Sequence, residues 1–139
     1  SEIHKGIVGF SSDNMGDTFS LNATDGGEPL VYSRGEGAYP LLLSPGNFGQ
    51  IDSHNLLFYI ANNALLCKNL NLTGKGAKEQ EILDNEVPKV VAAEVKPHKA
   101  VATTDRTGNI IVYYLSALGH ISAAISSDGG DHWETMANF

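Results

Sequence analysis

The stretch of the chain richest in reactive side chains is residues 121–136, which holds three acids, a histidine and the only tryptophan. Two carboxylates beside an imidazole could bind a cation or move a proton. The spacing favours a tight turn instead, because Gly129 and Gly130 can adopt the positive φ angles of a hairpin. The short side chain of Asp128 can accept hydrogen bonds from the amides of that same turn. We therefore expect a structural hairpin here.

Residues suited to recognition lie elsewhere in the chain. The glycine-rich segment 34–39 brings together a cation, an acid and an aromatic side chain in Arg34, Glu36 and Tyr39. Arg106 is the other of the two arginines in the chain, and a guanidinium group can bind a carboxylate through two parallel hydrogen bonds. These four residues are the ligand-binding candidates.

Other kinds of chemistry find little support. The five histidines show neither HxH nor HExxH spacing, which argues against a metal site. The serines lack a GxSxG elbow, and the chain has no phosphate loop or dinucleotide fingerprint. We expect no metal and no cofactor.

Charge narrows the class of partner. The 139-residue chain carries a net charge of −7, which disfavours binding to nucleic acid or to anionic membrane. The single cysteine, Cys67, excludes an internal disulfide, and we expect it to be a buried, inert thiol. The compartment stays open, with an extracellular, virion or cell-surface location favoured.

The elements that must position these residues are short strands. Apolar runs recur at spacings near ten residues, separated by Gly, Pro, Asn and Asp, and Asn62-Asn63 predicts a two-residue hairpin connection. Residues 73–88 are polar and predict a loop with a short strand at 79–83, without a helix. Residues 1–139 are therefore expected to form one all-β domain or propeller segment, with a β-sandwich as the alternative. The main expected strands are residues 29–33, 39–43, 54–61, 64–72, 89–95, 99–104, 110–115 and 121–126.

A known motif accounts for the last hairpin. The pattern Ser126-x-Asp128-x-Gly130-x-x-Trp133 resembles the Asp-box (BNR repeat), the SxDxGxxW hairpin of sialidase-like β-propellers. A degenerate second copy, with one extra residue and Phe in place of Trp, is expected at Ser11, Asp13, Gly16 and Phe19.

The resemblance implies a fold and a structural role for these residues. In that family the Asp-box joins the third and fourth strands of a four-stranded antiparallel blade and faces away from the active site. The last blade would then consist of residues 99–104, 110–115, 121–126 and 132–138, and residues 39–83 would supply another. About two and a half to three blades are expected, whereas closed propellers have roughly four to eight.

Three hypotheses for function follow from the resemblance. The leading one is a module that binds carbohydrate, including sialic-acid-containing glycans, or protein, with further blades supplied by a homo-oligomer or a longer chain. The second is part of a sialidase-type glycoside hydrolase. Sialidases hold the substrate carboxylate with three arginines, so two arginines outside the family's FRIP-like context cannot complete that site in one copy. The third is a purely structural β-domain of a surface or virion assembly.

Overall fold

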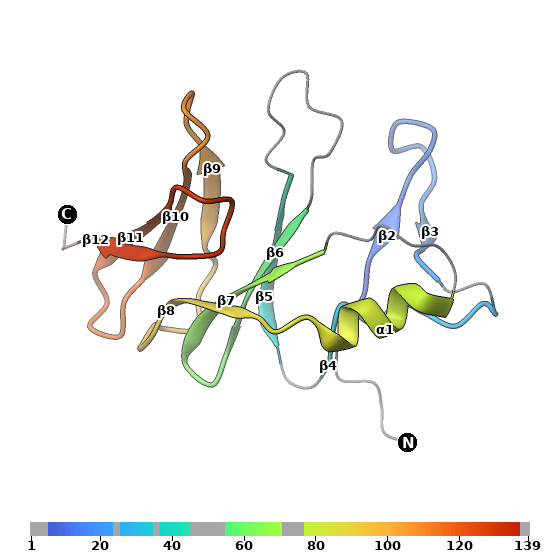
Figure 1. Ribbon diagram of the computed structural model, residues 1–139, viewed down its shortest axis with the longest axis horizontal. Helices are drawn as coiled ribbons and strands as arrows, with labels where there is room; N and C mark the ends of the chain where they lie inside the picture. Colours follow the sequence, from blue (N-terminus) through green and yellow to red (C-terminus); the bar gives the residue numbers. More distant parts are fainter. Residues whose placement is uncertain (1–5, 24–25, 35–36, 45–54, 71–76, 137–139) are drawn as a thin grey trace. The chain divides into compact units, whose positions relative to one another are not determined.

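The computed structural model describes residues 6–23, 26–34, 37–44, 55–70 and 77–136 (Figure 1). Strands make up 49% of the structure and helix 6%, and the prediction of an all-β fold with four-stranded antiparallel sheets is confirmed. The chain divides into two compact units. Unit 1 contains Ser1–Gly37 and Leu72–Glu86, and unit 2 contains Ala38–Asn71 and Val87–Phe139.

The first sheet of unit 2 has its strands in chain order. The two central strands are joined by Asn62 and Asn63, whose φ angles of 52° and 62° fit a tight two-residue hairpin turn. This confirms the hairpin predicted from the asparagine pair. The strands are β5 (Ala38–Leu43), β6 (Leu56–Ala61), β7 (Ala64–Asn69) and β8 (Lys89–Ala92).

The second sheet of unit 2 is also an antiparallel meander. Its first three strands end where the sequence pattern predicted, and the fourth is shorter than the expected 132–138, since it begins at Glu134. The strands are β9 (Val101–Thr104), β10 (Ile110–Leu115), β11 (Ile121–Ser126) and β12 (Glu134–Met136).

The two sheets of unit 2 share one hydrophobic core and are drawn side by side in Figure 1. The first strands of the two sheets contact each other, β5 with β9, and so do the fourth strands, β8 with β12. Phe58 from one sheet and Val112 from the other are both fully buried, and Cys67 is 2% exposed, as expected. Removing such apolar side chains from water is the main source of stability in a fold of this kind.

Unit 1 combines two short antiparallel pairs with one helix. β1 (Gly6–Ile7) pairs with β4 (Ser33–Arg34), and β2 (Phe10–Ser11) pairs with β3 (Ser20–Leu21). The helix α1 spans Ala77–Asn85.

The helix corrects the sequence prediction, which expected a loop with a strand at 79–83. Leu83 is fully buried, and the side chain of Gln80 makes two hydrogen bonds to the backbone of Val31, at 2.9 and 3.0 Å. An isolated helix of this length is marginal in water, so contacts with distant residues must stabilise it. The fourth strand of the first sheet is accordingly β8, beyond the helix.

The strand predicted at 29–33 is also largely wrong. Only Ser33 of that segment lies in a named strand, and Pro29 forms an isolated bridge with Ala23. The backbone groups between them have other partners: Leu30 N–H donates to Asn22 O, and Val31 bonds Gln80.

The helix of the described region is too short and too polar to cross a membrane.

Candidate functional site

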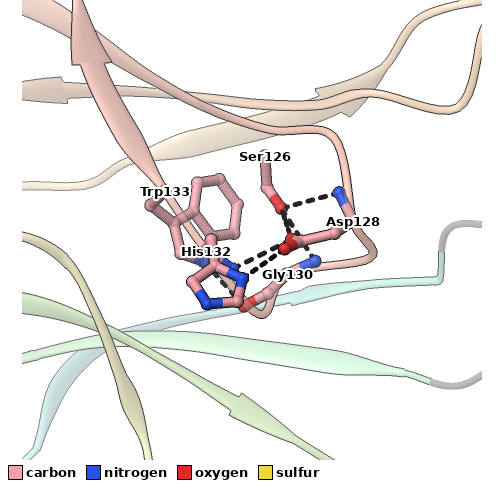
Figure 2. Close-up of polar contacts among 5 residues, drawn as sticks. All are labelled: Ser126, Asp128, Gly130, His132 and Trp133. Carbon is pink, nitrogen blue, oxygen red and sulfur yellow. Dashed lines mark hydrogen bonds and ion pairs between the residues drawn. The ribbon is translucent and has the colours of Figure 1, made fainter.

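The turn between β11 and β12 uses its serine and aspartate to satisfy its own backbone (Figure 2). Ser126 Oγ accepts hydrogen bonds from the backbone N–H groups of Asp128 at 3.4 Å and Gly130 at 2.9 Å. It donates its own proton to Asp128 Oδ1 at 2.8 Å. Ser126 is 1% exposed, so its hydroxyl is a buried structural group.

The carboxylate of Asp128 is equally committed to the turn. Its Oδ1 accepts the backbone N–H of His132 at 2.9 Å, and its Oδ2 lies within hydrogen-bonding distance of His132 Nδ1. These bonds, the backbone one first, hold the pKa of Asp128 well below its ordinary value. The geometry supports a hairpin cap, which agrees with the structural role expected for this stretch.

The same turn anchors the second sheet to the first. Trp133 Nε1 donates to Gly130 O at 2.8 Å, which satisfies the polar end of the indole. The indole ring meets Phe58 edge-on, with ring centroids 5.7 Å apart and an interplanar angle of 83°. At Gly130, where φ is +103°, a Cβ atom would lie 3.2 Å from Leu56 Cδ1. Both the backbone conformation and the close packing therefore favour glycine.

The turn between β2 and β3 repeats these hydrogen bonds with different residues. Ser12 Oγ accepts the N–H groups of Asn14 at 3.3 Å and Gly16 at 2.8 Å, and it donates to Asn14 Oδ1 at 2.8 Å. Asn14 Oδ1 accepts the N–H of Thr18 at 2.9 Å. Ser12, Asn14, Gly16 and Phe19 therefore occupy the places of Ser126, Asp128, Gly130 and Trp133.

This correspondence corrects the predicted register of the first copy, which used Ser11 and Asp13 with one extra residue. No residue is extra, and Asn14 replaces the aspartate. Ser11 instead lies in β2, where its Oγ donates to Asn22 Oδ1 at 2.7 Å. The flanking strands agree with the new register: Phe10 pairs with Leu21 as Ala124 pairs with Thr135, and Ser11 pairs with Ser20 as Ile125 pairs with Glu134.

Arg34, a ligand-binding candidate, is engaged within unit 1. Its Nε and Nη2 donate to the two carboxylate oxygens of Asp84 in α1, at 2.8 and 3.2 Å. This pair raises the pKa of Arg34, mainly through the side-chain hydrogen bond and then through charge. The Nε–Nη2 edge of the guanidinium group, which could bind the carboxylate of a ligand, already binds the carboxylate of Asp84. Glu36, the neighbouring candidate, lies outside the described residues.

Arg106 lies in the exposed turn between β9 and β10. Asp105 orders this turn, because its Oδ1 accepts the N–H groups of Thr107 and Asn109, both at 2.9 Å. Hydrogen bonds, that of the Thr107 side chain first, lower the pKa of Asp105. In an antiparallel meander the β9–β10 and β11–β12 turns lie at the same end of the sheet. Arg106 therefore lies at the same end of the sheet as Asp128.

Tyr39 has an unusual backbone conformation at the start of β5. Its φ is +55°, and the pairing of β5 with β6 shifts register between Ala38 and Leu41. A bulky side chain at positive φ is uncommon and costs conformational energy, and β-bulges redirect side chains away from the regular pleat. Tyr39 is 42% exposed.

Three further residues with positive φ lie at the same end of unit 2: Asn62 and Asn63 in the β6–β7 turn, and Glu94 after β8 with φ +58°. Ala38, beside Tyr39, pairs with Ile60 near this turn. Asn63 O accepts the N–H of Val95 at 2.8 Å. We call this group of Tyr39, Asn62, Asn63 and Glu94 the Tyr39 end.

Backbone hydrogen bonds also join the Tyr39 end to the second sheet. Glu94 O accepts the N–H of Ala117, and Leu115 O accepts that of Lys96, both at 2.9 Å. These bonds reach the β10–β11 turn, which lies opposite the β11–β12 turn within its sheet. Lys96 and His120 add exposed polar side chains there.

The Tyr39 end offers an aromatic face, two amide side chains and a carboxylate, and Lys96 adds an ammonium group beside it. Backbone strain of this type gathers at binding and catalytic sites. The sequence pattern indicates Tyr39, whereas at Asn62 and Asn63 it predicts only a turn. Glu94 carried no local signal, because its place depends on bonds to the β10–β11 turn.

Among the described residues, no three His, Cys, Asp or Glu side chains gather as a metal ion would require. Searches of protein-family models, curated proteins and solved structures found no match to this chain.

Proposed function

We propose that the chain is a portion of a sialidase-like Asp-box β-propeller and acts as a binding module for carbohydrate or protein, with its ligand at the Tyr39 end. The observation that carries this proposal is the positive φ of two exposed residues at that end of the first sheet, Tyr39 and Glu94. Tyr39 and Glu94 are neither glycine nor asparagine, yet both have positive φ. Such conformations persist where the surrounding structure imposes them, and they are typical of ligand sites.

The sheet arrangement supports the propeller part of the proposal. Blades of a propeller are four-stranded antiparallel meanders, as both sheets of unit 2 are. In unit 2 first strand contacts first strand and fourth contacts fourth, as in neighbouring blades. The repeated Ser–Asx turn supports the assignment to an Asp-box family.

The side chains favour a carbohydrate over other small ligands. Sugars present apolar C–H faces that stack on an aromatic ring, and hydroxyl groups that bond to amides and carboxylates. A sialidase reaction has less support, because Arg34 is paired with Asp84 and Arg106 lies at the far end of its sheet.

The test is a glycan array screened with the purified chain, followed by calorimetric titration of the best ligand. We expect Tyr39→Ala to abolish measurable binding, because it removes the stacking ring. Arg106→Ala is the matched control at the opposite end of the same unit and should bind normally. If Arg106→Ala abolishes binding while Tyr39→Ala retains it, the proposed location of the ligand site is wrong. If no glycan on the array binds, the proposal that the ligand is a carbohydrate is wrong.

A second variant separates binding from folding. At φ +55° glycine carries no Cβ penalty, so Tyr39→Gly should be more stable than Tyr39→Ala by about 1 kcal/mol. Both variants should still lose the ligand. Urea denaturation checks the first expectation and titration the second; equal stability of the two variants would contradict the strained backbone.

A further inference from the structure

The hairpin of β2 and β3 presents an exposed apolar face. Phe10 and Leu21 are cross-strand partners, and Val8 and Phe19 lie two residues before them in the chain. Their exposed fractions are 43% for Val8, 61% for Phe10, 61% for Phe19 and 38% for Leu21. We call these four residues the front face. Contiguous exposed apolar surface is typical of an interaction site.

The second hairpin shows what such a face packs against. By the shared register, Ala124 occupies the place of Phe10, and Trp133 that of Phe19. Ala124 is fully buried and belongs to the core shared with the first sheet, and Trp133 contacts Phe58. The equivalent surface in unit 2 therefore lies against the face of a four-stranded sheet.

The second sheet of unit 2 carries a face suited to the same role. Side chains alternate along a strand, so the side opposite the shared core holds Val101, Tyr113, Ile121 and Met136. Their exposed fractions are 63%, 38%, 63% and 45%. We call these four residues the back face.

The back face repeats the layout of the surface that receives Trp133. In the first sheet, Phe58 lies on the second strand between its partners Leu41 and Cys67. In the second sheet, Tyr113 lies on the second strand between Val101 and Ala123. Tyr113 is thus placed to receive Phe19 as Phe58 receives Trp133.

We propose that the front face of one chain docks on the back face of a second copy of the same chain. Both faces are made of apolar side chains, and the chain already pairs faces of these two kinds between its own sheets. The two faces differ, so the contact is heterologous and joins copies head to tail, in a ring or an open array. This interaction is independent of the ligand site at the Tyr39 end.

Sedimentation velocity of the 139-residue chain over a range of concentrations tests the contact. We expect mass to rise with concentration. Phe19→Asp places a charge in the front face, and Val101→Asp places one in the back face. Each variant should weaken association about 30-fold, as losing an interface hot spot does. Leu118→Asp, at a turn residue that is 82% exposed and outside both faces, is the matched control and should associate normally.

Mixing the variants gives the sharper result. Phe19→Asp retains a back face and Val101→Asp retains a front face, so an equal mixture should form a one-to-one dimer and nothing larger. Circular dichroism confirms folding, and Ile121→Asp replaces Val101→Asp if the latter does not fold. A chain that stays monomeric at every concentration, variants that associate normally, or a mixture that stays monomeric would each overturn the proposal.

Discussion

Asp128 and Asn14 perform the same task with different charge. Each accepts a backbone N–H four residues ahead and the hydroxyl proton of the serine two residues before it. One carbonyl-type oxygen is enough for these bonds, so a neutral amide can replace the carboxylate. What the turn requires at this position is an acceptor of the right length.

We therefore expect Asp128→Ala to lower the free energy of unfolding, as the loss of a turn or helix cap does. Asp128→Asn should lose clearly less at neutral pH, because it keeps the acceptor. Asp131→Ala, at the neighbouring exposed acid, serves as the control and should be close to wild type. Urea denaturation measures all three; equal losses for Ala and Asn at position 128 would contradict the capping role.

Lowering the pH should show how the charge of Asp128 contributes to the stability of the folded chain. Its pKa is lowered in the folded chain, so the carboxylate contributes stability that is fully present above its unfolded pKa of about 4. That stability is lost as the pH falls through the folded pKa. We expect the wild type to lose more stability than Asp128→Asn between pH about 5 and the folded pKa. Asp105, whose pKa is also lowered, is common to both proteins and cancels in the difference. Parallel curves of unfolding free energy against pH would contradict this assignment.

At the scale of elements, α1 shows how a side chain can replace a strand partner. Gln80 donates to Val31 O and accepts from Val31 N–H, and so completes both backbone groups of a residue outside any named strand. Its Nε2 also donates to Asp84 Oδ1 at 2.9 Å, which joins this contact to the Arg34 pair. The helix and the β4 segment therefore stabilise each other.

Gln80→Ala should destabilise unit 1 by about 1–2 kcal/mol, because it leaves two partly buried backbone groups of Val31 without their partner. Arg34→Ala should cost less, at most about 1 kcal/mol, since its ion pair with Asp84 is largely exposed. Glu81→Ala, at an exposed position on the same helix, is the control. Amide hydrogen exchange at Val31 gives a local readout, and unchanged protection in Gln80→Ala would contradict the contact.

At the scale of the whole molecule, unit 2 depends on one core between two sheets. Phe58 lies at its centre, fully buried and in contact with Trp133 from the second sheet. Other side chains of this core include Leu56, Ile60, Leu65, Ile110, Val112 and Tyr114. Tyr114 is 8% exposed, and this burial raises the pKa of its phenol.

Phe58→Ala should lower the free energy of unfolding by about 3–5 kcal/mol, the cost of a large cavity in a packed core. Leu42→Ala, on an exposed position of β5, should change it little. Because Trp133 packs on Phe58, its fluorescence should also change in the first variant and not in the second. A loss below about 1 kcal/mol for Phe58→Ala would contradict the shared core.

The sequence by itself determined the strands and turns of unit 2, because alternating apolar residues and turn-forming pairs such as Asn62-Asn63 act over a few neighbouring positions. It also identified the Ser126–Trp133 hairpin as structural. Only the tertiary structure decided the register of the first turn, since Ser11 and Ser12 are chemically equivalent choices until the strands pair. It likewise decided α1, which depends on Val31, and the pairing of Arg34 with Asp84, fifty residues away along the chain. The candidate site followed the same division: the sequence indicated Tyr39, whereas its strained backbone and its neighbour Glu94 depend on contacts between strands that no local pattern encodes.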